Sequence, residues 1–414
     1  MAITVAVVAA GAATVILRPR SGLIDPAAID PRAYFSEAEI RRAEDFRGVQ
    51  RLIGVGSLLI SGATLAVLAL AGGGCQGGRC PPWMPSPPAP VLRLLERAGE
   101  KPVRGGALVA AGISVTLTVT GIPLSVWAHE RAVDYGLSTQ SLGPWFADLG
   151  KSAAIAAAIA AAGGAVGIAL IRRFPANWWI PAAAVVTCFA VIALYLSPVL
   201  IDPLFNRFEP LPPGELRSEV MRLADRAGVD VGEVYRVDAS RRTTAINAYV
   251  GGLGHTKRVV LYDNLIEDYP ERQVRSVVAH ELGHVKNSDV PKGLLWVAIV
   301  ALPGMLLVRR LTEAIGGRSG GPASLPALAL SLGVVSFGLT CAGNTLSRPV
   351  EARADSYALE LTGDPQAFIA LERSLALRNL GDPDPPALFH TLFGTHPTTV
   401  ERIGFGEAVR REGR

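Results

Sequence analysis

Seven apolar stretches of this chain reach or approach the length of a membrane-spanning helix, and they constrain its fold more than any other feature. They are residues 2–17, 52–71, 105–128, 152–171, 178–200, 293–308 and 325–346. A helix needs about 20 mostly apolar residues to cross the hydrocarbon core of a bilayer. The first stretch is short and its arginines follow it, so we interpret it as an uncleaved anchor. Stretch 293–308 is marginal, with a buried core helix as its alternative. The chain is predicted to be a mainly α-helical integral membrane protein with about seven transmembrane helices.

The composition agrees with a membrane protein and argues against other classes. Half of the 414 residues are apolar and only 18% are charged, whereas soluble chains are nearer a quarter charged. The net charge is +4, but the basic residues are spread over the loops without a run that alternates with aromatics. We therefore expect the lipid bilayer and not nucleic acid as a partner. The excess of arginine over lysine, with many Ala and Gly residues, suggests a bacterial source and thus a bacterial cell membrane.

The number of spans predicts which polar regions share a compartment. Two spans separate residues 201–291 from residues 347–414, so these polar regions lie on the same side of the membrane. Residues 18–51 share that side and residues 72–104 lie opposite; the former carry seven arginines and the latter five basic residues. The positive-inside rule then predicts that residues 18–51, 201–291 and 347–414 face the cytoplasm. Cys75 and Cys80 would lie on the opposite, oxidising side, where a disulfide and two free thiols are equally acceptable predictions.

The remaining two cysteines, Cys188 and Cys341, fall in apolar segments and are predicted to be small buried residues.

We predict four regions from this pattern. Residues 1–200 form an N-terminal membrane region with about five helices, and residues 201–292 form an α+β insertion that contains the sequence H-E-L-G-H. Residues 293–346 hold two further transmembrane helices, and residues 347–414 form a C-terminal helical region.

The insertion has alternating helix and strand patterns. Apolar spacing predicts a helix over 215–227, and strands are predicted over 231–237, 245–250 and 258–262. A second amphipathic helix is predicted to begin after Tyr269 and Pro270 and to end near Asn287.

The motif His280-Glu281-Leu282-Gly283-His284 lies inside this second helix. Residues four apart lie on one face of a helix, so His280 and His284 can bind one metal ion. Glu281 lies next to the first histidine and can take a proton from a water activated by that metal. This arrangement predicts zinc-dependent hydrolysis, with one Zn²⁺ per chain.

Zinc requires a third protein ligand. The candidates are His255, His390, His396 and carboxylates after the motif, of which Glu351 is the best. Glu351 follows the last span on the correct side, and Asp355 lies one helical turn further, where it could orient a ligating histidine. The alternative is that both carboxylates belong to a solvated, charged helix face.

Together, H-E-L-G-H, the later S-R-P-V-E-A-R-A-D and the seven spans closely resemble the integral-membrane CAAX prenyl protease family of zinc metalloproteases. Further matching segments are 201–211, Asn247-Ala248-Tyr249 and Thr395-His396-Pro397 with Arg402-Ile403. The resemblance implies a small zincin-type metalloprotease domain, with Glu351 as third zinc ligand and Glu281 as general base.

The resemblance also implies roles for residues outside the metal motif. Asn247 and Ala248 would belong to an edge strand that pairs with an extended peptide. His396 and Arg402 would stand near the scissile carbonyl and stabilise the oxyanion or hold the peptide. The implied substrate is a peptide or a membrane protein, and the implied chamber is enclosed by the membrane helices.

Three alternatives can be weighed on the residues. An intramembrane protease would carry the motif inside an apolar span, with a distant Asp as third ligand, yet here charged residues flank the motif. A quality-control protease acting on damaged membrane proteins would use the same mechanism. A non-catalytic zinc-binding scaffold would have no need of Glu281. No sequence pattern indicates the oligomeric state.

Overall fold

The computed structural model describes residues 1–73, 100–252, 257–316 and 320–413. Cys75, Cys80 and His255 lie outside the described residues, so the predictions made for them are untested.

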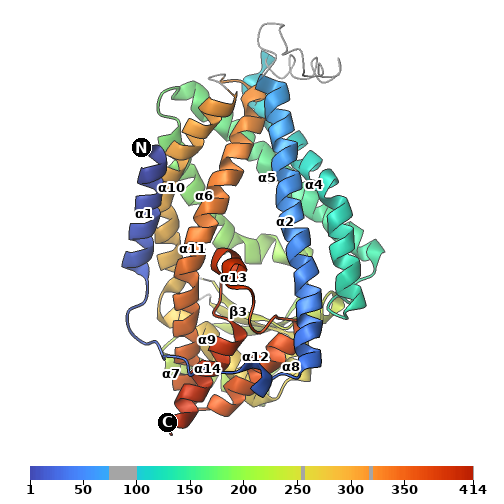
Figure 1. The fold of residues 1–414 in the computed structure, drawn as a ribbon, viewed down its shortest axis with the longest axis vertical. Coiled ribbons are helices and arrows are strands. Elements are labelled where there is room, and N and C mark those ends of the chain that lie inside the picture. Colours follow the sequence, from blue (N-terminus) through green and yellow to red (C-terminus); the bar gives the residue numbers. More distant parts are fainter. Residues whose placement is uncertain (74–99, 253–256, 317–319, 414) are drawn as a thin grey trace.

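Six of the described helices are long and apolar enough to cross a membrane. They are α2 (Glu37–Gly73), α4 (Pro102–Asp134), α5 (Leu142–Arg173), α6 (Trp179–Leu200), α10 (Asp289–Gly316) and α11 (Leu325–Thr362). The shorter α1 (Ala2–Leu17) packs along α10 and α11, where the indole of Trp296 donates a hydrogen bond of 3.1 Å to Thr14 Oγ1. The predicted helical membrane bundle of about seven helices is confirmed (Figure 1).

Several of these helices extend well beyond the apolar stretch that predicts them. Helix α2 begins at Glu37, where the hydroxyl of Ser36 accepts from the backbone of Glu39 and the Glu39 carboxylate accepts from the backbone of Ser36. This reciprocal capping satisfies helix-end donors outside the apolar region. The polar ends therefore project from the bundle toward the α/β elements.

Helix α11 is the longest, with 38 residues or about 57 Å at 1.5 Å per residue. It continues without interruption through Pro349, so the last apolar stretch and the segment that carries Glu351 and Asp355 are one helix. The helix ends at Gly363, whose φ of 61° is the left-handed conformation that glycine adopts without strain.

A four-stranded sheet forms the centre of the α/β region, in the order β1-β2-β4-β3. The strands are β1 (Phe208–Pro210), β2 (Glu233–Val237), β3 (Ala248–Gly251) and β4 (Arg258–Tyr262). The β2/β4 pair is parallel, whereas β1/β2 and β3/β4 are antiparallel. The three predicted strands are thus confirmed with shifted ends, and β3 lies at an edge of the sheet.

The α/β region is completed by six helices: α7 (Glu215–Ala227), α8 (Asp263–Asp268), α9 (Glu271–Lys286), α12 (Pro365–Arg378), α13 (Ala387–Phe393) and α14 (Thr399–Arg411). Short 3-10 turns occupy Pro31–Ala33, Asp202–Leu204, Ala239–Arg241 and Pro322–Ser324. Buried side chains of α7, such as Leu223, share one core with Val259 of β4 and with Val278 and Leu282 of α9. This core fixes the helix that carries the metal motif.

Residues 18–36, which we call the N-terminal strap, connect α1 to α2 along the far end of the molecule (Figure 1). The strap backbone donates from Ile24 to Ser356 Oγ and from Ala27 to the Gly404 carbonyl, both at 3.0 Å. A Cβ at position 404 would lie 2.5 Å from the Ala27 carbonyl oxygen, so the close approach requires glycine. The strap thereby joins α11 and α14.

The prediction that Cys188 and Cys341 are buried is wrong. Cys188 on α6 is exposed and Cys341 on α11 is partly exposed. Both helices belong to the membrane bundle, where an exposed side chain faces lipid and a small apolar thiol needs no burial.

Candidate metal centre

Helix α9 carries His280 and His284 on the side that faces α11. At the crossing of the two helices, a Cβ on Gly283 would lie 3.1 Å from Tyr357 Cδ1 and 3.4 Å from Ala354 Cα. The glycine of the motif therefore allows α9 to approach α11 closely. This approach places Glu351 of α11 opposite the two histidines.

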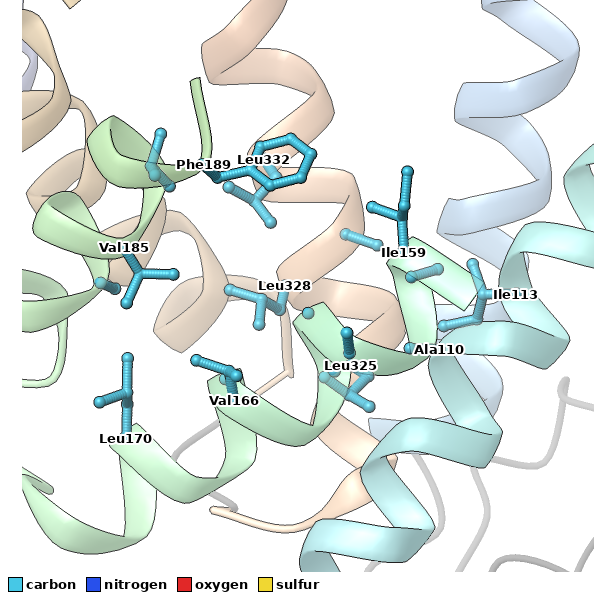
Figure 2. A pocket seen from close by; sticks show the side chains of 18 of the residues that line it. Ala110, Ile113, Ile159, Val166, Leu170, Val185, Phe189, Leu325, Leu328 and Leu332 are labelled. Atoms are coloured by element: carbon cyan, nitrogen blue, oxygen red, sulfur yellow. The ribbon is translucent and has the colours of Figure 1, made fainter. Parts of the chain in front are cut away.

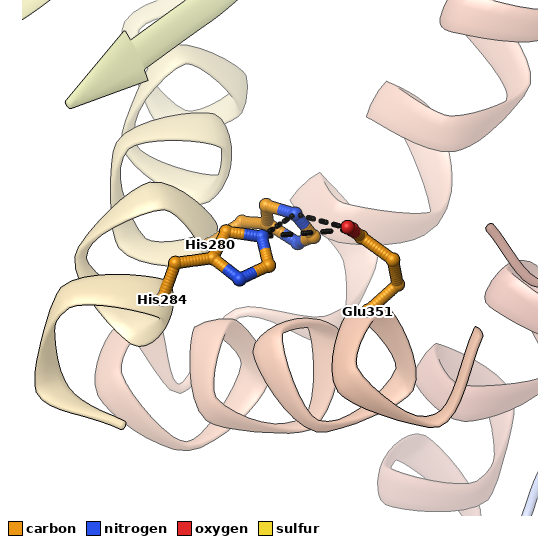
Figure 3. A group of neighbouring side chains, drawn as sticks. All are labelled: His280, His284 and Glu351. Carbon is orange, nitrogen blue, oxygen red and sulfur yellow. Dashed lines mark hydrogen bonds and ion pairs between the residues drawn. The ribbon is translucent and has the colours of Figure 1, made fainter. Parts of the chain in front are cut away.

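The three predicted ligands meet at one point (Figure 3). One ligand atom from each of His280, His284 and Glu351 lies within 4.8 Å of the other two. Glu351 Oε2 is 3.2 Å from His280 Nε2 and 3.5 Å from His284 Nε2, and the two Nε2 atoms are 3.1 Å apart. The structure thus brings together residues 67 to 71 positions apart in sequence, as Figure 3 shows.

The other nitrogen of each imidazole is held by a carboxylate. His280 Nδ1 lies 2.8 Å from Asp355 Oδ1, and His284 Nδ1 lies 3.0 Å from Asp289 Oδ2. When each Nδ1–H donates to its carboxylate, each Nε2 directs a lone pair into the same space as the Glu351 oxygen. Glu351 Oε2 is buried and accepts no hydrogen bond from the described residues. This convergence of electron pairs fits a cation that binds nitrogen and oxygen ligands, such as Zn²⁺.

The electrostatics of the histidines also favour positive charge at this point. Burial lowers the pKa of His280, but Asp355 and Glu351 outweigh it and raise this pKa to about 10. Burial likewise lowers the pKa of His284, but Asp289 and Glu351 outweigh burial and raise this pKa to about 9. Three carboxylates around two imidazoles therefore stabilise a cation, whether it is a proton or a metal ion.

Glu281 lines a cavity of about 160 Å³ beside the metal centre. His280, His396 and Asn247 line the same cavity, so the carboxylate shares it with a ligand and with the sheet edge. Burial raises the pKa of Glu281, an effect that the neighbouring His280 and His284 partly oppose. A carboxylate with a raised pKa is a more effective proton acceptor near neutral pH.

Arg402 from α14 lies behind the metal centre, between two buried carboxylates. Its Nε and Nη2 atoms donate to both oxygens of Asp355, at 2.8 and 2.5 Å, and its Nη1 lies 2.7 Å from Glu372 Oε2. Burial lowers the pKa of Arg402, but Asp355 and Glu372 outweigh it and raise this pKa overall. The guanidinium is thus engaged with the carboxylate that orients His280.

His396 lies at the open side of the centre, with 53% of its side chain exposed. Its Nε2 is 3.2 Å from Glu351 Oε2, and its Nδ1 is 2.8 Å from the Thr395 hydroxyl. The Nε2 atom of His390 lies 2.9 Å from the backbone carbonyl oxygen of His396. His390, which was considered only as an alternative ligand, therefore contacts the His396 backbone and not the three-ligand cluster.

Asn247 and Ala248 lie at the edge of the sheet next to the cavity. Asn247 lines the cavity and accepts a hydrogen bond of 3.1 Å from the Tyr262 backbone, and Ala248 begins the edge strand β3. Within the described part of the chain, strand β3 pairs on one side only, with β4. Its other side can accept an extended chain.

Sequence analysis did not identify Asp289 and Glu372. Asp289 follows the turn at Asn287 and Ser288, where Ser288 adopts a positive φ of 55° that begins a new helix. Only that reversal brings the Asp289 carboxylate back to His284. Glu372 lies on α12, and its contact with Arg402 joins two helices whose packing no local pattern indicates. The only sequence signal for Glu372 is that an acidic residue lies on an otherwise apolar face of the helix.

Comparison with known proteins agrees with this geometry. Residues 210–408 match the model of peptidase family M48, and residues 90–207 match the CAAX prenyl protease N-terminal model, described as five membrane helices. An uncharacterized metalloprotease of Bacillus subtilis is 31% identical over 91% of this chain and 88% of its own length. The CAAX prenyl protease 1 homolog of Arabidopsis thaliana is 29% identical over 78% of each chain. The crystal structure of S. mikatae Ste24p covers 92% of this chain and 91% of its own, with a TM-score of 0.72 and 21% identity.

Proposed function

The chain belongs to peptidase family M48, as a multi-pass membrane metalloprotease related to the CAAX prenyl proteases, and on this premise we propose a specific zinc endopeptidase mechanism. One Zn²⁺ per chain would be held by His280, His284 and Glu351. When bound, zinc supplies a Lewis acid that polarises a scissile carbonyl and acidifies a water. The observation that carries the proposal is the convergence of two Nε2 lone pairs and one unsatisfied carboxylate oxygen.

Glu281 acts as the general base. Its carboxylate takes a proton from the attacking water and later delivers it to the leaving amine, so that one group serves both steps. The raised pKa of Glu281 supports this cycle, because the carboxylic acid form must also be accessible.

His396 stabilises the oxyanion from the open side of the centre. With the Thr395 hydroxyl donating to Nδ1, Nε2 carries the proton that a developing negative charge requires. Arg402 acts through Asp355, which it neutralises while that carboxylate orients His280. Asn247 and Ala248 align the peptide through the free side of β3.

The centre faces the cytoplasm of a bacterial cell in this proposal. Helix α9, which carries two of the proposed ligands, and the C-terminal helices α12 and α14 lie toward one end of the bundle, the same end as the strap and the start of α2 (Figure 1). The arginines of that end support a cytoplasmic position by the positive-inside rule.

Two variants test the mechanism. Glu281→Gln keeps the shape of the side chain but removes the base, so we expect zinc to stay bound while peptide cleavage falls by about 10²–10⁴-fold. His280→Ala removes a ligand and is expected to lose both zinc and cleavage. Zinc content and cleavage are measured on both variants; full activity in Glu281→Gln would refute the role of Glu281.

The substrate is a peptide ending in a CAAX-type sequence in this proposal, by analogy with the named function of the Arabidopsis relative. Purified protein is incubated with a farnesylated CAAX peptide and with the same peptide unmodified. Preferential cleavage of the farnesylated peptide supports this substrate. Equal cleavage of both, together with cleavage of unfolded membrane proteins, would favour the quality-control alternative.

A further inference from the structure

A cavity of about 660 Å³ lies among the membrane helices (Figure 2). Its walls come from α4, α5, α6, α10 and α11, and almost all of the side chains are apolar. Such a volume is typical of a site for a small organic molecule. Ser114 and Trp178 supply the only side-chain polar atoms among its lining residues.

The cavity exists because consecutive helices diverge. Helix α5 packs against α4, and α6 packs against α10, so a wedge opens between α5 and α6. Two glycines of α5 leave the wedge unfilled: a Cβ on Gly163 would meet no atom within 4 Å, and one on Gly167 would lie 3.9 Å from Leu328. Val185 and Phe189 on α6 and Ile159 on α5 line the wedge and are themselves exposed.

The cavity is about as deep as the hydrocarbon region of one membrane leaflet. Its lining runs over residues 159–170 of α5 and 178–189 on the α6 side, which is about 16 Å in each case at 1.5 Å per residue. This is about half of the ~30 Å hydrocarbon core. A single hydrocarbon chain extending from the membrane surface therefore fits its length.

The position of the cavity along α11 places it beyond the reach of a hydrocarbon chain attached to a peptide at the metal centre. Leu332, the lining residue of α11 nearest to the ligands, precedes Glu351 by 19 positions of one continuous helix, or about 28 Å. The acyl chains of one leaflet cover about half of the ~30 Å core, and a farnesyl chain is shorter than such an acyl chain. A prenyl group on a peptide bound at the metal centre would end well short of the cavity.

Positive charge lies at the end of α5, within one helical turn of the cavity lining. Arg172 and Arg173 end α5 two and three residues after the lining Leu170, and both are exposed. Among the described residues neither has a carboxylate partner, whereas Arg309 and Arg310 at the same end lie beside Glu313. Trp178 stands at the same level, where aromatic side chains mark the membrane interface.

We propose that this cavity binds one acyl chain of an anionic phospholipid from the leaflet opposite the metal centre, with the phosphate held by Arg172 and Arg173. The apolar walls accept the chain and the two guanidinium groups match the charge of the headgroup. The site is independent of the proposed protease mechanism, since it lies about one bilayer thickness from the metal ligands.

The experiment uses the full-length purified protein, native mass spectrometry, and phosphatidylglycerol or phosphatidylcholine with identical acyl chains. We expect wild type to retain one phosphatidylglycerol per chain with preference over phosphatidylcholine. Gly163→Leu adds a side chain to the wedge at a position where a Cβ meets no atom within 4 Å, and it should weaken retention at least about tenfold, a change of about 1.4 kcal/mol. Gly112→Leu is the matched control, because position 112 on α4 is also free of contacts but does not line the cavity.

A double variant tests the headgroup contact. Arg172→Gln with Arg173→Gln should abolish the preference for phosphatidylglycerol while the acyl chain still binds. Wild-type retention in Gly163→Leu would overturn the site, as would displacement of phosphatidylglycerol by the farnesylated peptide, which would assign the cavity to substrate. Zinc content and cleavage, measured in parallel, are expected to stay unchanged, so loss of lipid is distinguishable from failure of the protease mechanism.

Discussion

Asp355 Oδ1 lies 2.8 Å from Nδ1 of His280, one helical turn after Glu351 on the same face of α11. One helix thus supplies both a proposed ligand and the group that orients a second ligand. The spacing E-x-x-x-D produces this arrangement only because α11 remains helical through Pro349.

The first prediction concerns that hydrogen bond. Asp355→Asn keeps an acceptor for His280 but removes the charge that favours a cation, so we expect zinc affinity to fall about 10–100-fold. Competition with a chelator of known affinity measures the change. Asp289→Asn makes the same change behind His284 and should give a loss of similar size. Unchanged affinity in both variants would contradict a metal-orienting role for these carboxylates.

The second prediction separates catalysis from metal binding at His396. His396→Ala should lower kcat about 10²–10³-fold, as expected for loss of one oxyanion donor, with zinc content unchanged. Steady-state kinetics on the CAAX peptide give kcat and KM separately. A rise in KM with constant kcat would instead assign His396 to peptide binding. His390→Ala, which removes a contact to the His396 backbone, should produce a smaller loss of kcat.

The third prediction concerns pH and the N-terminal strap. The hydroxyl of Tyr34 donates to the buried carboxylate of Glu407, and burial together with this carboxylate raises the pKa of Tyr34 to about 12. Tyrosine in the unfolded chain titrates near ~10, so the stabilisation is complete below that pH and is lost as the pH rises from about 10 through 12. Melting temperature should fall over this interval in wild type, and less steeply in Tyr34→Phe. Parallel curves for the two proteins would show that Tyr34 does not contribute.

The fourth prediction compares two adjacent glycines of α5. A Cβ on Gly164 would lie 2.5 Å from the Gly106 carbonyl oxygen of α4, whereas one on Gly163 meets nothing within 4 Å. Gly164→Ala should therefore destabilise the protein by about 1–3 kcal/mol through overpacking. Gly163→Ala should be neutral or slightly stabilising, because alanine favours the helix. Thermal unfolding in detergent distinguishes the two, and equal melting temperatures would argue against close α4–α5 contact.

Sequence alone predicts the parts of this protein that depend on local periodicity. Apolar length indicates the membrane helices, and the four-residue spacing of His280 and His284 places both side chains on one face. Glu351 could also be predicted from the sequence, because the number of spans places it on the same side of the membrane as the histidine motif.

Features that depend on distant packing could not be predicted. The contact of Asp289 with His284 requires the chain reversal at Ser288, and the pairing of Arg402 with Glu372 requires α12 and α14 to meet. The continuation of α11 through Pro349 also opposes local expectation, since proline removes a helical hydrogen bond. The wedge beside Gly163 depends on the divergence of α5 and α6, which no spacing in either helix encodes.

The length of α11 has a mechanical consequence. One end of this rod contributes Leu325 and Leu328 to the wall of the lipid cavity, and the other end carries Glu351. Because α11 is one uninterrupted helix, it fixes the height of the proposed metal centre relative to the membrane surface. Under the proposed mechanism, a substrate tethered to the bilayer is cleaved only where its chain reaches the level of Glu351.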